Sequence, residues 1–188
     1  MSTRDDLIAA AADLLDQGGP AAVTLRAVGQ RAGVSHNAPY KHFADKEDLL
    51  ATIAGRELSR RSGAPRANEG PGEALERRAK AYVRWAMRYP QRFKLVFGAW
   101  SQGNAELAEA ASASRAAFVD TVRAAQAAGL APAGDPARVT ALVLALAHGA
   151  ADLALSGHLS REGKGAADPE DLVDDLLALM AAGRGGAG

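Results

Sequence analysis

The sequence contains no cysteine, and this absence excludes two kinds of chemistry. Neither disulfide bonds nor thiolate metal sites can form in such a chain. A chain without disulfides fits a reducing compartment, so we expect a cytoplasmic protein.

Sequence patterns of common catalytic sites are also missing. The chain has no glycine-rich phosphate-binding loop, no G-x-S-x-G elbow and no H-E-x-x-H pair, and its four histidines lack the spacing of metal ligands. We therefore expect no enzymatic activity, no cofactor and no metal site.

Long hydrophobic runs are scarce. Residues 139–157 come nearest to a membrane span, but His148, Asp152 and many alanines favour a buried helix of a soluble protein. Charged residues interrupt the N-terminal run at Arg4, Asp5, Asp6 and Asp13, so we expect no signal peptide and no membrane partner.

The chain does have enough length and apolar content for a folded, helical protein. Its 188 residues are 48% hydrophobic, which suits one helical unit with a small appended domain. We predict an all-α fold of about nine helices: a three-helix DNA-binding domain over residues 1–50, a connecting helix and hinge loop over 51–72, and a helical bundle over 73–188.

Residues 24–43 form the most informative segment, because they are typical of a helix-turn-helix. Thr24 is a good N-cap for a first helix, and Gly33 is suited to a turn with positive φ. Ser35 can cap a second helix. Gly29 in mid-helix indicates a close crossing, and Pro39 predicts a tightened or bent start to the second helix.

Local charge supports DNA binding by this segment. Residues 24–46 carry four basic residues against Asp45 alone, a local +3 in a chain whose formal net charge is +0. Side chains here could donate to phosphates or read base edges. The predicted DNA-binding residues are Thr24, Arg26, Ser35, His36, Asn37, Tyr40, Lys41, His42 and Lys46. A generic αα-hairpin is the competing interpretation.

The same residues resemble the TetR family of bacterial transcriptional regulators. The shared pattern includes Thr24, Ala32-Gly33-Val34-Ser35, Tyr40, His42-Phe43 and Lys46. The resemblance implies that Tyr40, His42 and Lys46 hold phosphates while residues 35–41 face the major groove. Gly29 replaces the usual alanine, and Pro39 replaces the usual leucine or isoleucine.

The remainder of the chain resembles, more weakly, the C-terminal regulatory domain of one subgroup of that family. Tyr82-Val83-Arg84-Trp85 and His148-Gly149 carry this resemblance, and Leu144 stands where the subgroup has tryptophan.

Two further sets of residues are predicted from the C-terminal helices. An apolar effector with one polar group would be lined by aromatic residues and one histidine: Trp85, Phe93, Phe97, Trp100, Phe118 and His148. Plain core packing is the alternative. A dimer interface is predicted from the apolar faces of helices near 136–157 and 169–182, with Val143, Leu146, Ala150, Leu172, Val173 and Leu176.

Together these patterns favour a homodimeric, sequence-specific regulator that binds a palindromic operator in double-stranded DNA. We expect a repressor that a small-molecule effector releases. The alternative is a ligand-binding or interaction protein with little specific DNA affinity. A basic face on the helix near 73–88 is predicted to be solvated.

Overall fold

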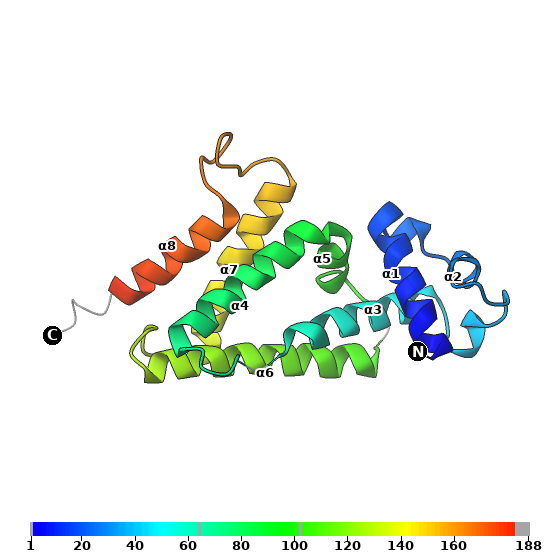
Figure 1. The fold of residues 1–188 in the computed structure, drawn as a ribbon, viewed down its shortest axis with the longest axis horizontal. Helices are drawn as coiled ribbons and strands as arrows, with labels where there is room; N and C mark the ends of the chain where they lie inside the picture. Colours follow the sequence, from blue (N-terminus) through cyan, green and yellow to red (C-terminus); the bar gives the residue numbers. More distant parts are fainter. Residues whose placement is uncertain (1, 64, 102, 183–188) are drawn as a thin grey trace. The chain divides into compact units, whose positions relative to one another are not determined.

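The computed structural model describes residues 2–63, 65–101 and 103–182. Within these ranges the chain forms eight α-helices and one short 3-10 helix, and β-structure there is limited to an isolated bridge between Ser160 and Gly165. The predicted all-α fold is therefore confirmed (Figure 1). The last part of the predicted C-terminal bundle, residues 183–188, lies outside the described residues.

The chain divides into two compact units. Unit 1 contains residues 1–62 and 89–114, and unit 2 contains residues 63–88 and 115–188. Residues 89–114 follow the predicted hinge in the sequence, yet they pack with the N-terminal residues.

Unit 1 is built around α1 (Thr3–Ala22), α2 (Leu25–Arg31) and α3 (Lys46–Arg61), with the short helix α5 (Pro90–Val96) packed on α1 and α3. Its core contains Leu7, Leu15, Val28, Leu49 and Ile53, each at most 1% exposed. Asp45 caps α3, because its carboxylate accepts the Asp48 N–H at 2.8 Å.

A glycine pair interrupts α1 near its C-terminal end. Gly18 and Gly19 have non-helical backbone angles, with φ of +66° at Gly19, and one further helical turn follows from Pro20. Positive φ costs a glycine no Cβ clash, so the chain can turn here before entering α2.

An ion network fastens α5 into unit 1. The Arg92 guanidinium donates to the Asp16 carboxylate of α1 at 2.6 Å and to the Glu57 carboxylate of α3 at 2.9 Å. The Arg92 and Glu57 side chains are only 11% and 6% exposed. Since a half-broken buried ion pair is costly, this network holds α5 on α1 and α3.

Unit 2 contains three helices that all contact one another: α4 (Pro71–Arg88), α7 (Pro136–Leu155) and α8 (Pro169–Ala182). Asp135 and Asp168 cap the proline starts of α7 and α8, since each accepts a backbone N–H two residues on, at 2.9 Å. The helix α6 (Ala105–Ala127) begins in unit 1 and ends in unit 2.

The prediction of a solvated basic face on α4 is wrong for most of that face. Arg77 donates to Glu69, Lys80 pairs with Asp174 of α8 at 2.6 Å, and Arg84 pairs with Glu170 of α8. The carboxylates of Asp174 and Glu170 come from distant sequence positions, so the local pattern gave no sign of them.

By length and composition α7 could cross a membrane, and within the described chain it is the one helix that could. One third of the apolar stretch of α7 is buried in the fold. The helix packs against α4 and α8. One such helix is weak evidence of a membrane span, because a core helix of a soluble protein passes the same test of length and composition.

Candidate nucleic-acid interface

The helix α2 is held at both ends by the residues that the sequence singled out. The Thr24 hydroxyl accepts the Ala27 N–H at 3.1 Å. At the other end Gly33 has φ of +67°, its N–H donates to the Gln30 carbonyl, and the Val34 N–H donates to the Gly29 carbonyl at 3.0 Å. These two bonds make a Schellman turn, so the chain leaves α2 in a fixed direction.

The second element of the motif differs from the predicted helix. Residues 36–38 form a turn, and only η1 (Pro39–Lys41) is helical, with 3-10 geometry. The expected Ser35 cap is wrong, because η1 is preceded by Ala38 and lacks a side-chain cap bond. Pro39 has no N–H to donate to Ser35 and crowds the preceding turn, which explains the tighter geometry.

Gly29 provides the close crossing that the sequence predicted. A Cβ atom placed on Gly29 would lie 3.2 Å from Cγ of Pro39 and 3.5 Å from the Ser35 carbonyl oxygen. The glycine and proline therefore fit each other, and together they seat residues 35–42 against α2.

Residues 35–42 present an apolar side inward and a polar side outward. Pro39 and Phe43 are buried, with Phe43 in the core of unit 1 and 2% exposed. With Pro39 and Phe43 directed inward, the polar side chains of the segment lie on the surface. Tyr40 is 60% exposed. The exposed residues are Ser35, His36, Asn37, Tyr40, Lys41 and His42.

Several of these side chains are free to bind a ligand outside the protein. Among the described residues, Arg26, His36, Asn37, Tyr40 and Lys41 form neither a hydrogen bond nor an ion pair. Arg31 is different, because it donates to Gln17 at 2.9 Å and lies 4.0 Å from the Asp13 carboxylate. Exposed donors without internal partners, together with a local +3 charge, suit the phosphates and base edges of DNA.

Thr24 and Lys46 flank this surface. The Thr24 hydroxyl is an acceptor in the cap and keeps a proton to donate outward. Lys46 is the first residue of α3 and is half-buried. All nine predicted DNA-binding residues thus belong to unit 1.

The six predicted ligand-binding residues fall into both units. Trp85, Phe118 and His148 belong to unit 2, whereas Phe93, Phe97 and Trp100 belong to unit 1. In unit 2 the His148 Nδ1 atom lies 2.8 Å from the Tyr82 hydroxyl, and the Tyr82 and Trp85 rings are 6.0 Å apart. Sequence reasoning did not select Tyr82 as a ligand residue, because its spacing on α4 equally suits the core.

The predicted interface residues differ in their burial. Val143, Ala150 and Val173 are at most 4% exposed within the single chain, so they pack in the core of unit 2. Leu146, Leu172 and Leu176 are half-buried. On the same helices Leu142, Leu153 and Leu179 are 60%, 48% and 70% exposed.

Unit 1 has the arrangement of a DNA-binding helix-turn-helix domain, and comparisons with known proteins identify the family. A model of the tetR family of bacterial regulatory proteins matches residues 7–53, and a model described as a tetracyclin repressor-like C-terminal domain matches residues 75–180. The chain belongs to the TetR family of transcriptional regulators. A search of curated proteins finds no match.

Several solved structures share the fold over nearly the whole chain. A protein of unknown function from Rhodococcus sp. RHA1 is 30% identical, with a TM-score of 0.82, over 97% of this chain and 95% of that one. A TetR regulator from the same organism is 23% identical, with a TM-score of 0.61, over 95% and 94%. The regulator FadR from Bacillus subtilis, in complex with stearoyl-CoA, is 13% identical, with a TM-score of 0.67, over 95% and 98%.

Proposed function

We propose that this regulator is a cytoplasmic repressor that binds a palindromic operator as a homodimer and is released by a small-molecule effector. The observation that carries the DNA-binding part is the exposed polar surface of residues 35–42. Its donors lack internal partners among the described residues, and they project from a turn seated on α2.

In this proposal the exposed side chains have two roles. Tyr40, Lys41, His42 and Lys46 hold phosphates, which fix the register on the duplex but carry no sequence information. His36 and Asn37 read base edges in the major groove, where an asparagine amide can pair with adenine. Thr24, Arg26 and Ser35 add donors at the edge of this surface.

The homodimer part rests on the exposed leucines of α7 and α8. Leu142, Leu153 and Leu179 lie on helices that already pack together in unit 2. A two-fold contact through these helices would bury them and place two copies of residues 35–42 on one duplex, about 34–36 Å apart.

The effector part rests on the aromatic group of unit 2. Trp85, Tyr82 and His148 offer an apolar surface with one polar pair, which suits an apolar molecule with a single polar group. FadR, a regulator of the same fold, is known with stearoyl-CoA bound, which supports a small-molecule effector here. Release would follow if the bound effector changed the spacing of the two DNA-reading surfaces.

The salt dependence of DNA affinity tests the assignment of phosphate contacts. Each lost phosphate contact should lower the magnitude of the slope of log K against log salt by about 0.9. We expect this change for Lys41→Met and for Lys46→Met, at every operator sequence. Asn37→Ala should instead relax preference at one operator position, by about 1–3 kcal/mol.

Lys94→Met is the matched control, because Lys94 is an exposed lysine of unit 1 that lies outside residues 24–46. Its slope should equal that of the wild type. Unchanged slopes and affinities for both Lys41→Met and Lys46→Met would refute the contacts. Absence of salt-dependent binding by the wild type would favour a ligand-binding or interaction protein.

A further inference from the structure

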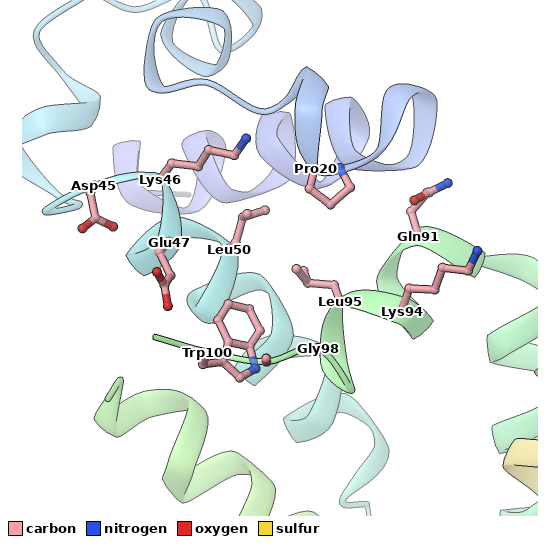
Figure 2. A pocket seen from close by; sticks show the side chains of 11 residues that line it. Pro20, Asp45, Lys46, Glu47, Leu50, Gln91, Lys94, Leu95, Gly98 and Trp100 are labelled. Atoms are coloured by element: carbon pink, nitrogen blue, oxygen red, sulfur yellow. The ribbon is translucent and has the colours of Figure 1, made fainter. Parts of the chain in front are cut away.

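Unit 1 contains a cavity of about 640 Å³. Figure 2 shows that its lining comes from the last turn of α1, the first turns of α3, and α5 with the residues that follow it. The volume lies in the range of about 300–1,000 Å³ that is typical of small-molecule sites. Every lining residue belongs to unit 1.

One side of the cavity is apolar. Leu50, Leu95 and Pro20 contribute aliphatic surface, and the half-buried Trp100 contributes an indole ring. Such a lining favours a ligand with an apolar body, because burying that body removes its surface from water.

The charged groups around the cavity differ in how the protein uses them. Among the described residues, the Lys46 and Lys94 ammonium groups have neither a hydrogen bond nor an ion pair. The carboxylates do: Asp45 accepts the Asp48 N–H at 2.8 Å, and Glu47 accepts the Ser101 N–H at 2.6 Å and the Ser101 hydroxyl. In Figure 2 the Lys46 ammonium extends toward Pro20, while the two carboxylates point to the other side. The Lys46 ammonium is therefore free to bind an anion at this site, whereas Figure 2 shows the Lys94 side chain directed away from Lys46.

We propose that this cavity binds small amphipathic carboxylates, with the apolar body against Leu50, Leu95 and Trp100 and the carboxylate on Lys46. Since Lys46 is also a proposed phosphate contact, the bound carboxylate competes with DNA for the same ammonium group. The competition between carboxylate and DNA rests on the proposed function, whereas the binding of the carboxylate to the cavity does not. The site lies in the DNA-reading unit itself, apart from the aromatic group of unit 2.

Tryptophan fluorescence measures the binding directly. The chain has two tryptophans, so Trp85→Phe leaves Trp100 as the only reporter, at the cavity wall. Titration with ω-bromooctanoate, whose bromine quenches a ring in contact with it, should give saturable quenching. The methyl ester of the same compound lacks the negative charge and should bind at least about tenfold more weakly, because a charge-assisted hydrogen bond is worth about 1.5–3 kcal/mol.

Three lysine variants in the Trp85→Phe protein locate the anion. Lys46→Met should weaken carboxylate binding about tenfold and leave ester binding unchanged. Lys94→Met should leave both unchanged, because the Lys94 side chain is directed away from Lys46. Lys41→Met is the control, since Lys41 is an exposed lysine of the same unit that does not line the cavity. Equal affinities of carboxylate and ester, or equal affinities of all three variants, would overturn the anion site.

Ala99→Phe tests the cavity and the competition with DNA together. Ala99 is an exposed lining residue, so a larger side chain there should narrow the space without disturbing the fold, which circular dichroism checks. The variant should bind both bromooctanoate and its ester more weakly, and its DNA affinity should respond less to the carboxylate. In the parent protein, which retains Ala99, saturating carboxylate should weaken DNA binding and lower the magnitude of the slope of log K against log salt.

The outcomes of the two proposals are distinguishable. Undiminished quenching in Ala99→Phe, or no saturable quenching in its parent, would overturn the cavity site whatever happens with DNA. Saturable carboxylate binding with unchanged DNA affinity would overturn the shared use of Lys46. A protein that binds the carboxylate but no DNA would refute the proposed function and leave the site standing.

Discussion

At the residue scale, Gly29 and Pro39 would each destabilise a helix alone, but in this fold the two residues fit each other. Glycine inside a helix costs about 0.5–1 kcal/mol relative to alanine, and proline removes a backbone donor. In this fold the missing Cβ of Gly29 leaves room for the Pro39 ring, which would otherwise lie 3.2 Å from it. These are the two positions where the motif departs from the family pattern, so we infer that the departures compensate each other.

A double-mutant cycle on this pair tests the inference. Gly29→Ala should stabilise the protein by about 0.5–1 kcal/mol when Pro39 is already alanine, because helix propensity then acts without a clash. With Pro39 present the same substitution should give a smaller gain or a loss. Urea denaturation measures the four free energies of unfolding. Effects that add within about 0.3 kcal/mol would contradict the coupling.

At the scale of single elements, Glu69 connects the loop before α4 to the helix itself. Its carboxylate accepts two hydrogen bonds from the Arg77 guanidinium and one from the Arg66 N–H at 3.0 Å. The Arg77 bonds, followed by the Arg66 bond, lower the pKa of Glu69 from its ordinary 4.5 to about 2. In unit 1 the Arg56 guanidinium, with further bonds from Ser2, likewise holds the pKa of Asp5 well below its usual range.

These depressed pKa values predict a loss of stability in acid. A carboxylate whose folded pKa is lowered stabilises the fold above its unfolded pKa, and that contribution disappears as the pH falls through the folded pKa. The free energy of unfolding should therefore decrease from about pH 4.5 to about pH 2. Glu69→Gln should flatten this dependence, and the exposed Glu162→Gln should not. Equal slopes for both variants would contradict the role of Glu69.

The sequence predicted some elements well because their signals are local. Asp45, Asp135 and Asp168 cap helices within three residues of themselves, and the starts of α3, α7 and α8 follow. The 3-10 geometry after Ser35 was only partly predictable, because it depends on how Pro39 meets Gly29 of another element. The Arg92 network and the lining of the cavity beside Trp100 both combine residues of α1, α3 and α5. Contacts between elements far apart in the sequence leave no local pattern from which to predict them.

At the scale of the whole molecule, the proposed dimer depends on apolar side chains that a single chain leaves exposed. Leu142 and Leu179 are 60% and 70% exposed, on helices that also bury Val143 and Val173 completely. A second copy that covered these leucines would remove their apolar surface from water.

Charge substitutions separate the interface from the core. Leu142→Glu and Leu179→Glu should give monomers with wild-type circular dichroism, because neither side chain belongs to the core. Val173→Glu is the contrasting variant, and it should unfold the protein by burying a charge. Sedimentation at micromolar concentration measures the assembly. Dimers that persist in both leucine variants would place the interface elsewhere.

Selection of binding sites from a random duplex library tests the central claim most directly. A homodimeric, sequence-specific regulator should enrich a palindrome whose half-sites are one helical turn apart, about 10–10.5 base pairs centre to centre, or a multiple of this. The enriched duplex should bind the wild type at least about a thousandfold more tightly than a scrambled one at physiological salt. Recovery of no common sequence, or equal affinity for both duplexes, would contradict the account.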